Sequence, residues 1–360
     1  MDQFTLVLPF GLVPPEFLND LSRALQAPAL TMLLSRNSSY RLSTDDGGAR
    51  VLPHEAWLAR AFGAASQDAA PFAAAAMVGL GVQPAGQDGA GRWFIVEPVH
   101  VQLARTHMTL ADPRGLRLDE AGARALYDTV RPYFDELGMP LLYGGAHTWF
   151  MRADGWHDLR TASPDAAING NLSDWMPDGA AKRDFRKLQN EVQMLWHEHP
   201  VNAARQARGL PPVNTFWLWA GADAARAHSY PGTLATSACP QWLTALADPE
   251  QRSGKPASRL AAPPSPSARL DALLAQAGDA TMVLGELIAP GLSDDWSQWL
   301  MQMQELEQRW FAPLLAAVQD GRIKRLHLVL GNRNSLAEST VTRGALRKFW
   351  RKPNLNKLST

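Results

Sequence analysis

The stretch between residues 180 and 221 constrains the fold most, because it joins a long helix to a buried strand through a proline-fixed turn. In Ala180–His199 the apolar residues recur at helical spacing, and lysines and arginines supply the solvated face. Pro200 predicts that this helix ends near His199. The run Thr215–Trp219 is compact and rich in strand-forming residues. The apolar positions of the helix are Phe185, Leu188, Val192 and Leu195.

Helical and strand-like segments alternate along the rest of the chain. The apolar run Phe4–Leu8 predicts a buried first strand, and residues 16–34 and 294–319 have helical patterns. Residues 281–288 and 325–330 read as further strands. This alternation predicts an α/β fold with a doubly wound, mostly parallel sheet that has helices on both faces.

One block differs from this pattern and predicts a second domain. Residues 91–160 contain a strand, a helix and two short strands after a glycine-rich loop, so we expect a small inserted α/β domain there. Residues 1–90 and 161–360 would then form the core. Within the core, residues 248–269 are rich in proline, serine and alanine, which indicates a flexible surface loop.

Charge and cysteine content limit the partners and the compartment. Lysine plus arginine and aspartate plus glutamate are 35 each, so no global field attracts nucleic acid or a membrane, and any such preference must come from a local patch. The single cysteine, Cys239, excludes an intrachain disulfide and fits a reducing compartment. With no signal peptide pattern and no membrane-spanning run, we expect a cytoplasmic protein without membrane contact.

Polar residues in the turns of the central stretch are the candidate ligand-binding residues. His199, Asn202, Arg205 and Asn214 lie between the long helix and the strand. Arginine and asparagine in turns beside strand ends suit an anionic small molecule. The alternative is that the asparagines satisfy turn backbone while Trp217 and Trp219 fill the core.

The same stretch resembles a known family. His199-Pro200, Asn202, Arg205, Gly209, Pro212, Asn214, Trp217-Leu218-Trp219 and Gly221 match the middle of the archaeal-type cofactor-independent phosphoglycerate mutases, and Ala220 stands where they have glycine. The chain is similar also to the proteobacterial regulatory proteins of the RpfE type. The resemblance implies an alkaline-phosphatase-like fold with two divalent metals, such as manganese, and a serine or threonine nucleophile at the carboxyl ends of the strands.

The positions where that family holds its metals read differently here. Its first strand leads to an aspartate and a glycine, and this chain has Pro9-Phe10-Gly11 instead. The last strand, which ends in an aspartate and a histidine in the family, leads here to Asn332-Arg333. We therefore expect no catalytic residues, no bound metal or other cofactor, and a regulatory or ligand-binding role. The alternative is an active phosphomutase or phosphatase with a rearranged metal site, for which Glu286, Asp294 and Asp295 are candidate ligands.

The carboxyl-terminal segment is the one local basic patch. It contains Phe349 and Trp350 among lysines and arginines from Arg343 to Lys357. Such a segment suits an acidic protein partner, and the balanced charge of the whole chain argues against tight nucleic-acid binding. The alternative is a basic terminal helix that packs on the body through its apolar side.

Overall fold

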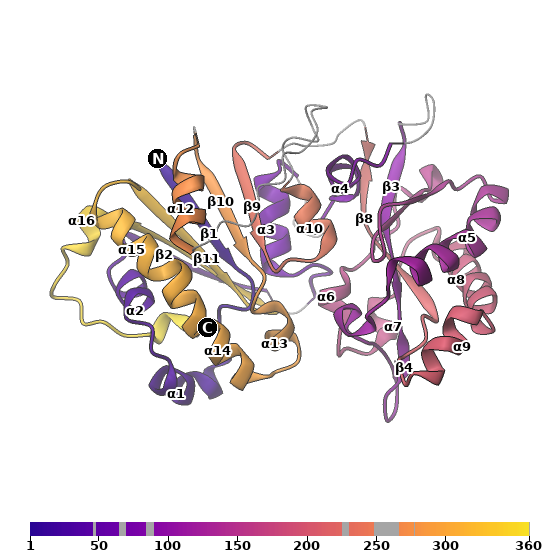
Figure 1. The fold of residues 1–360 in the computed structure, drawn as a ribbon, viewed down its shortest axis with the longest axis horizontal. Helices are drawn as coiled ribbons and strands as arrows, with labels where there is room; N and C mark the ends of the chain where they lie inside the picture. Colours follow the sequence, from indigo (N-terminus) through magenta and orange to yellow (C-terminus); the bar gives the residue numbers. More distant parts are fainter. Residues whose placement is uncertain are drawn as a thin grey trace. The chain divides into compact units, whose positions relative to one another are not determined.

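The computed structural model describes residues 1–45, 48–64, 70–83, 90–224, 230–247, 266–276 and 278–359, without the side chains of residues 266–268. The chain divides into two compact units (Figure 1). The first comprises Met1–Ala49 and Tyr230–Thr360, and the second comprises Arg50–Ser229. The predicted insert, residues 91–160, lies within the second unit. Most of the predicted flexible loop, residues 248–265, lies outside the described residues.

The first unit contains a mostly parallel sheet, as expected. Its strand order is β2-β12-β11-β1-β10-β9, and β1 pairs in parallel with both neighbours. Strands β12 and β2 add an antiparallel edge. The strands are β1 (Gln3–Leu8), β2 (Ser39–Thr44), β9 (Thr233–Ser237), β10 (Ala280–Leu284), β11 (Arg325–Gly331) and β12 (Ser335–Thr342).

The central strands are buried along almost their whole length. Phe4 to Leu8 of β1 and all of β10 are buried, which explains why their sequences are continuous apolar runs instead of alternating ones. β12 alternates between buried and half-buried residues, and β2 is largely exposed. The sheet therefore has a hydrophobic centre and a more polar antiparallel edge.

The helices of the first unit differ from the sequence expectation in two places. Residues 16–34 form two helices, of which the first ends at Ala24 and the second begins at Pro28, a residue suited to the first turn of a helix. Residues 294–319 begin as a helix at Trp296 and contain a π-helical turn, Glu307–Phe311, before α15. The helices are α1 (Pro15–Ala24), α2 (Pro28–Ser35), α10 (Gln241–Leu246), α12 (Pro266–Leu274), α13 (Ile288–Leu292), α14 (Trp296–Leu306), α15 (Ala312–Gln319) and α16 (Arg343–Leu346).

The second unit is built on an antiparallel sheet in the order β6-β7-β3-β8. Its strands are β3 (Arg92–Val99), β6 (Leu141–Tyr143), β7 (Trp149–Arg152) and β8 (Thr215–Asp223), and β4 (Val101–Leu103) and β5 (Met108–Leu110) form a separate hairpin. The helices are α3 (Pro53–Ala61), α4 (Ala73–Gly79), α5 (Glu120–Glu136), α6 (Pro164–Ala167), α7 (Leu172–Trp175), α8 (Lys182–His197) and α9 (Pro200–Ala207).

The long helix expected at residues 180–199 is confirmed as α8. Its residues Phe185, Leu188 and Val192 are buried in one core cluster with Phe134 of α5 and Phe94 of β3. The helix stops before Pro200, which becomes the first residue of α9. In the described parts of the chain, no helix is long and apolar enough to cross a bilayer.

Candidate functional site

The carboxyl edge of the parallel sheet in the first unit is the position at which α/β proteins usually bind ligands. At the end of β1, Phe10 is only 4% exposed and its backbone is left-handed, with φ of 58°. Its carbonyl oxygen accepts a 2.8 Å hydrogen bond from Nε1 of Trp299. A side chain at Gly291 would place its Cβ 2.5 Å from Cβ of Phe10, so these two residues are in close contact. An aromatic ring therefore occupies the end of β1.

A serine and a glutamate meet at the ends of the neighbouring strands β9 and β10. The hydroxyl of Ser237 donates to Oε1 of Glu286 at 2.6 Å. Oε2 of Glu286 is buried and has no hydrogen-bond partner among the described residues. Burial raises the pKa of Glu286, and the bond from Ser237 acts in the opposite direction. Glu286 is the carboxylate that the sequence placed at this edge, and here it is bonded to a hydroxyl.

Cys239 lies beside this pair. Residue Ala238 between Ser237 and Cys239 is left-handed, with φ of 51°, so the chain turns sharply after β9. Burial raises the pKa of the Cys239 thiol to about 12, and the Glu286 carboxylate adds to the effect. The thiol therefore stays protonated at neutral pH, which is the unreactive form.

Asp295 and Asn332, near the same sheet edge, form hydrogen bonds that shape the local backbone. Oδ1 of Asp295 accepts from the amide of Gln298 at 3.0 Å and caps α14, whereas Asp294 is left-handed with φ of 54°. Asn332 accepts from the amide of Ser335 at 2.8 Å and so shapes the turn between β11 and β12. Over the residues that the structure describes, no group of three or more histidine, cysteine, aspartate or glutamate side chains could hold a metal ion.

His199 and Asn202 lie together at the junction of α8, α9 and β8 in the second unit. His199 caps α9, because its Nδ1 accepts from the amide of Val201 at 3.2 Å, and its Nε2 lies 3.0 Å from Oγ1 of Thr129. The Asn202 amide nitrogen donates to the carbonyls of Trp196 and Val213, both at 2.8 Å. Its oxygen accepts from the amide of Val213 at 2.8 Å. Asn202 thus joins the end of α8 to the start of β8.

Arg205 and Asn214 fix the same region to other backbone segments. Arg205 is 6% exposed and donates through Nε to the carbonyl of Pro211 at 2.9 Å, and its terminal nitrogen donates to the carbonyl of Leu116. The side-chain amide of Asn214 exchanges two hydrogen bonds with the backbone of Val101, at 2.8 and 2.7 Å. The four sequence-predicted residues are therefore brought together, and each of them bonds to backbone groups.

Three buried acidic residues, Glu55, Glu97 and Asp165, were not among the sequence-predicted site residues. Glu97 accepts a 2.9 Å hydrogen bond from Nε1 of Trp219. The carboxylate of Asp165 accepts hydrogen bonds from both terminal nitrogens of Arg114, at 3.1 and 2.9 Å. Burial raises the pKa of Glu97 to about 8; burial, and then the charge of Asp165, raise that of Glu55 to about 8. The available signal was a glutamate inside the otherwise apolar strand Arg92–Val99.

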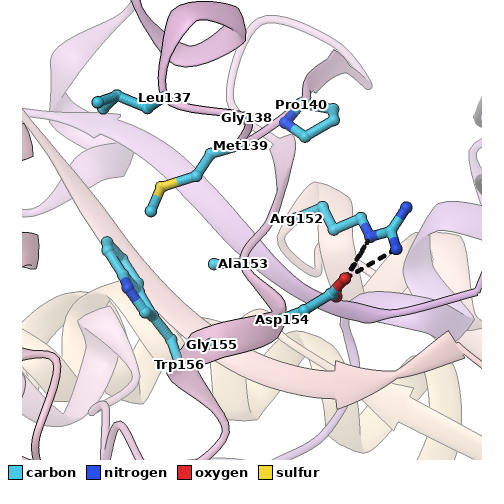
Figure 2. A pocket seen from close by; sticks show the side chains of 9 residues that line it. All are labelled: Leu137, Gly138, Met139, Pro140, Arg152, Ala153, Asp154, Gly155 and Trp156. Atoms are coloured by element: carbon cyan, nitrogen blue, oxygen red, sulfur yellow. Dashed lines mark hydrogen bonds and ion pairs between the residues drawn. The ribbon is translucent and has the colours of Figure 1, made fainter.

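A cavity of about 490 Å³ lies at the carboxyl end of α5, within the second unit. Figure 2 shows Met139 and Trp156 on one side and an ion pair between Arg152 and Asp154 on the other. In this ion pair, Nη2 of Arg152 lies 2.8 Å from Oδ2 of Asp154. The volume of the cavity falls in the range of small-molecule sites, and polar atoms make up more of its exposed lining than apolar atoms do. The lining residues are Leu137, Gly138, Met139, Pro140, Arg152, Ala153, Asp154, Gly155 and Trp156.

Comparison with known proteins relates the chain to solved structures only. No protein-family model matches the sequence, and no curated protein matches it. The PH0037 protein from Pyrococcus horikoshii is similar with a TM-score of 0.58 and 10% identity, over 99% of this chain and 91% of that one. A cofactor-independent phosphoglycerate mutase from Thermoplasma acidophilum DSM 1728 has a TM-score of 0.46 and 12% identity, over 99% and 94% of the two chains. At these identities, the similarity to the PH0037 protein shows a shared α/β fold over nearly the whole chain.

Proposed function

We propose that the chain is a phosphoglycerate-mutase-like protein that has lost the two-metal site and acts as a regulatory or ligand-binding protein. The observation that carries this proposal is Phe10. The family that the sequence resembles places a metal-binding aspartate after its first strand, and a buried ring stands there in this chain. A phenyl ring has no electron pair to donate to a hard divalent cation.

The remaining polar groups at this sheet edge do not fit a pair of divalent metals. Glu286 is bonded to Ser237, Asp295 caps a helix, and the Asn332 side-chain oxygen holds a turn. Two adjacent cations need several carboxylate or imidazole ligands that converge on them. This disagreement between the residues present and the implied metals supports a role without phosphoryl transfer.

The contacts of the second unit favour the cavity beside α5 as the ligand site. The donors of Asn202 and Arg205 point to backbone carbonyls, which supports the structural alternative for the His199, Asn202, Arg205 and Asn214 set. The cavity offers the half-buried side chain of Met139 and a charged pair opposite it, and the ring of Trp156 beside Met139 is almost fully buried. These surfaces suit a small amphipathic molecule with an aromatic or aliphatic body.

Metal analysis and a mutase assay test the loss of the metal site. The purified protein is saturated with manganese, desalted and analysed for bound metal, and conversion of 3-phosphoglycerate to 2-phosphoglycerate is followed with manganese present. We expect no stoichiometric metal and no turnover. Two bound ions, or a turnover that disappears in both Glu286→Gln and Ser237→Ala, would replace the proposal with an active enzyme that uses a rearranged site.

A fluorescent amphipathic dye, anilinonaphthalene sulfonate, tests the ligand site. Gly155 lines the cavity, and apart from its chain neighbours no atom lies within 4 Å of a Cβ built on it, so Gly155→Leu adds a bulky side chain to the lining without a collision at its Cβ. We expect the variant to lose dye binding that the unchanged protein has. Gly115 is equally unobstructed and lies outside the cavity lining, so Gly115→Leu is the matched control and should bind the dye normally. Equal binding by all three proteins contradicts the assignment of the cavity.

A further inference from the structure

The carboxyl-terminal segment of the first unit carries only positively charged side chains. Every charged side chain from Arg343 to Thr360 is a lysine or an arginine, in a chain whose total charges balance at 35 of each sign. The segment is anchored at both ends, because Leu346 on one side and Leu358 on the other are buried. Figure 1 shows the chain after α16 looping away from the helices of the unit before it returns. The anchored ends make this loop part of the folded unit.

Two large aromatic side chains project from this loop. Phe349 is 80% exposed and Trp350 is 67% exposed. Their rings contact each other edge to face, with centroids 5.3 Å apart and an angle of 81° between the planes. Single exposed apolar residues are ordinary, but an adjacent pair of this size forms one apolar projection that favours contact with a partner. The alternative interpretation, in which Leu346, Phe349 and Trp350 all pack on the body of the protein, is therefore confirmed for Leu346 and wrong for the two rings.

The cations around the rings are held in place by the carboxyl end of α2. Nζ of Lys348 donates to the carbonyl of Asn37 at 3.0 Å, and Nζ of Lys357 donates to that of Leu34 at 3.0 Å. Arg351 donates to Oδ1 of Asn37 at 3.1 Å. The carbonyls at a helix end carry partial negative charge, so they stabilise these cations without neutralising them. Burial, and then the nearby charges of Arg351 and Lys348, lower the pKa of Lys357, which shows how closely the cations gather.

We propose that Phe349, Trp350 and the surrounding cations form a docking surface for an anionic lipid bilayer. Tryptophan and phenylalanine favour the interfacial region of a membrane, and lysine and arginine are attracted to anionic headgroups. A fluid bilayer accommodates a projecting pair of rings without a matching cavity. The edge-to-face pair covers part of one ring face, which suits insertion better than the stacking of successive nucleic-acid bases.

This surface gives weak, reversible attachment, because a short apolar projection with a few cations falls far short of a spanning helix. The sequence-based expectation of no membrane contact rested on balanced total charge and the lack of a spanning run. Neither observation concerns a local patch. The proposal is independent of the proposed ligand-binding role, since it uses other residues in the other unit.

Vesicle flotation tests the docking surface with the full-length protein. The vesicles are phosphatidylcholine alone, or phosphatidylcholine with phosphatidylglycerol added. We expect binding to the anionic vesicles only, weakened by salt. The double variant Phe349→Ser/Trp350→Ser should bind at least about tenfold more weakly, and so should Arg347→Glu/Lys352→Glu. Both pairs are exposed, and circular dichroism verifies that the variants are folded.

Matched substitutions elsewhere control for general changes in hydrophobicity and charge. Met301→Ser removes another exposed apolar side chain of the first unit, 58% exposed on α14, and Arg183→Glu reverses an exposed cation on α8. Both should bind vesicles like the unchanged protein. The proposal is overturned if the unchanged protein does not bind anionic vesicles, or if the two double variants bind them as strongly as the unchanged protein. Capture of soluble polyglutamate through the same residues, without vesicle binding, would assign the surface to an acidic polypeptide instead.

Discussion

Asn202 and Val213 exchange two hydrogen bonds, each 2.8 Å long, across the turn that connects α9 to β8. A third bond from the Asn202 amide reaches the carbonyl of Trp196 at 2.8 Å. One buried side chain therefore satisfies three backbone groups from two parts of the chain. Buried backbone groups that lose their partner are costly, so the contact fixes the path of the turn.

Replacing Asn202 should strongly destabilise the protein. Asn202→Ala leaves the amide and the carbonyl of Val213 unpaired, whereas the carbonyl of Trp196 keeps its bond from the amide of His199. We expect the free energy of unfolding to fall by about 2 kcal/mol or more. Urea denaturation measures this change. Asn190 is exposed on α8, so Asn190→Ala is the control and should stay within about 0.5 kcal/mol. If Asn202→Ala lowered the free energy of unfolding no more than Asn190→Ala does, the turn would not depend on these bonds.

Ala220 occupies a conformation that suits glycine, with φ of 59°, beside an irregularity in the pairing of β3 with β8. Left-handed backbone costs an alanine roughly 1–2 kcal/mol, and glycine avoids this cost. Ala222 on the same strand is a matched control, because it is 6% exposed and Ala220 is 5% exposed. Its backbone, unlike that of Ala220, is not left-handed. We expect Ala222→Gly to be more destabilising than Ala220→Gly by about 1 kcal/mol or more in thermal or urea unfolding. Equal losses would mean that position 220 is not strained.

Glu307 should stabilise the first unit much more than Glu305. Its carboxylate accepts from the amides of Ala29 at 2.6 Å and Leu30 at 3.1 Å, at the start of α2. A carboxylate at a helix amino terminus is favourable, and we expect Glu307→Gln to reduce the free energy of unfolding by about 2 kcal/mol. Glu305 forms an exposed ion pair with Arg309 at 3.7 Å, so Glu305→Gln should cost less than about 0.5 kcal/mol. Calorimetry of the two isosteric variants compares them directly.

The buried Glu97 should make the second unit less stable in alkali. The pKa is raised from 4.5 to about 8 in the folded state, so between these values the folded state holds a proton that the unfolded state has released. Stability due to this group is therefore greatest below pH 4.5 and falls as the pH rises towards 8. Glu55 contributes in the same direction.

Glu97→Gln tests this dependence, because glutamine cannot ionise and its oxygen still accepts from Trp219. We expect the variant to resemble the unchanged protein in acid and to be more stable at alkaline pH by an amount on the order of a few kcal/mol. Unfolding is measured at several pH values, with the exposed Glu136→Gln as control. Parallel pH profiles for Glu97→Gln and the unchanged protein would contradict a protonated Glu97.

The sequence predicted the elements with strong periodicity and missed those defined by long-range contacts. β1 and α8 are found within about two residues of their expected bounds, because their apolar patterns are unbroken. β2 and β12 were missed, since an edge strand such as β2, Ser39–Thr44, has no apolar run and is stabilised by pairing with a distant segment. The same limit applies to Glu307, because its partners, the amides of Ala29 and Leu30, are far away in the sequence.

The contacts of the candidate site residues could not be predicted from the sequence. The sequence located the turn residues together, but their partners are backbone carbonyls of segments such as Leu116 and Val101, which no local pattern indicates. The cavity beside Trp156 combines the end of a helix with the end of a strand, and its lining has no motif. Anion binding by the turn and cytoplasmic location stay predictions.

The contact between Phe10 and Gly291 limits which residues positions 10 and 291 can hold. Any side chain at position 291 would collide with Phe10, and an aspartate at position 10 would be buried against the backbone of α13. A side chain at position 291 is therefore disfavoured while Phe10 is present. An aspartate in place of Phe10 alone would therefore be a buried, unpaired charge rather than a metal ligand. A metal ligand set at this sheet edge could be built only by replacing several residues around Phe10 together.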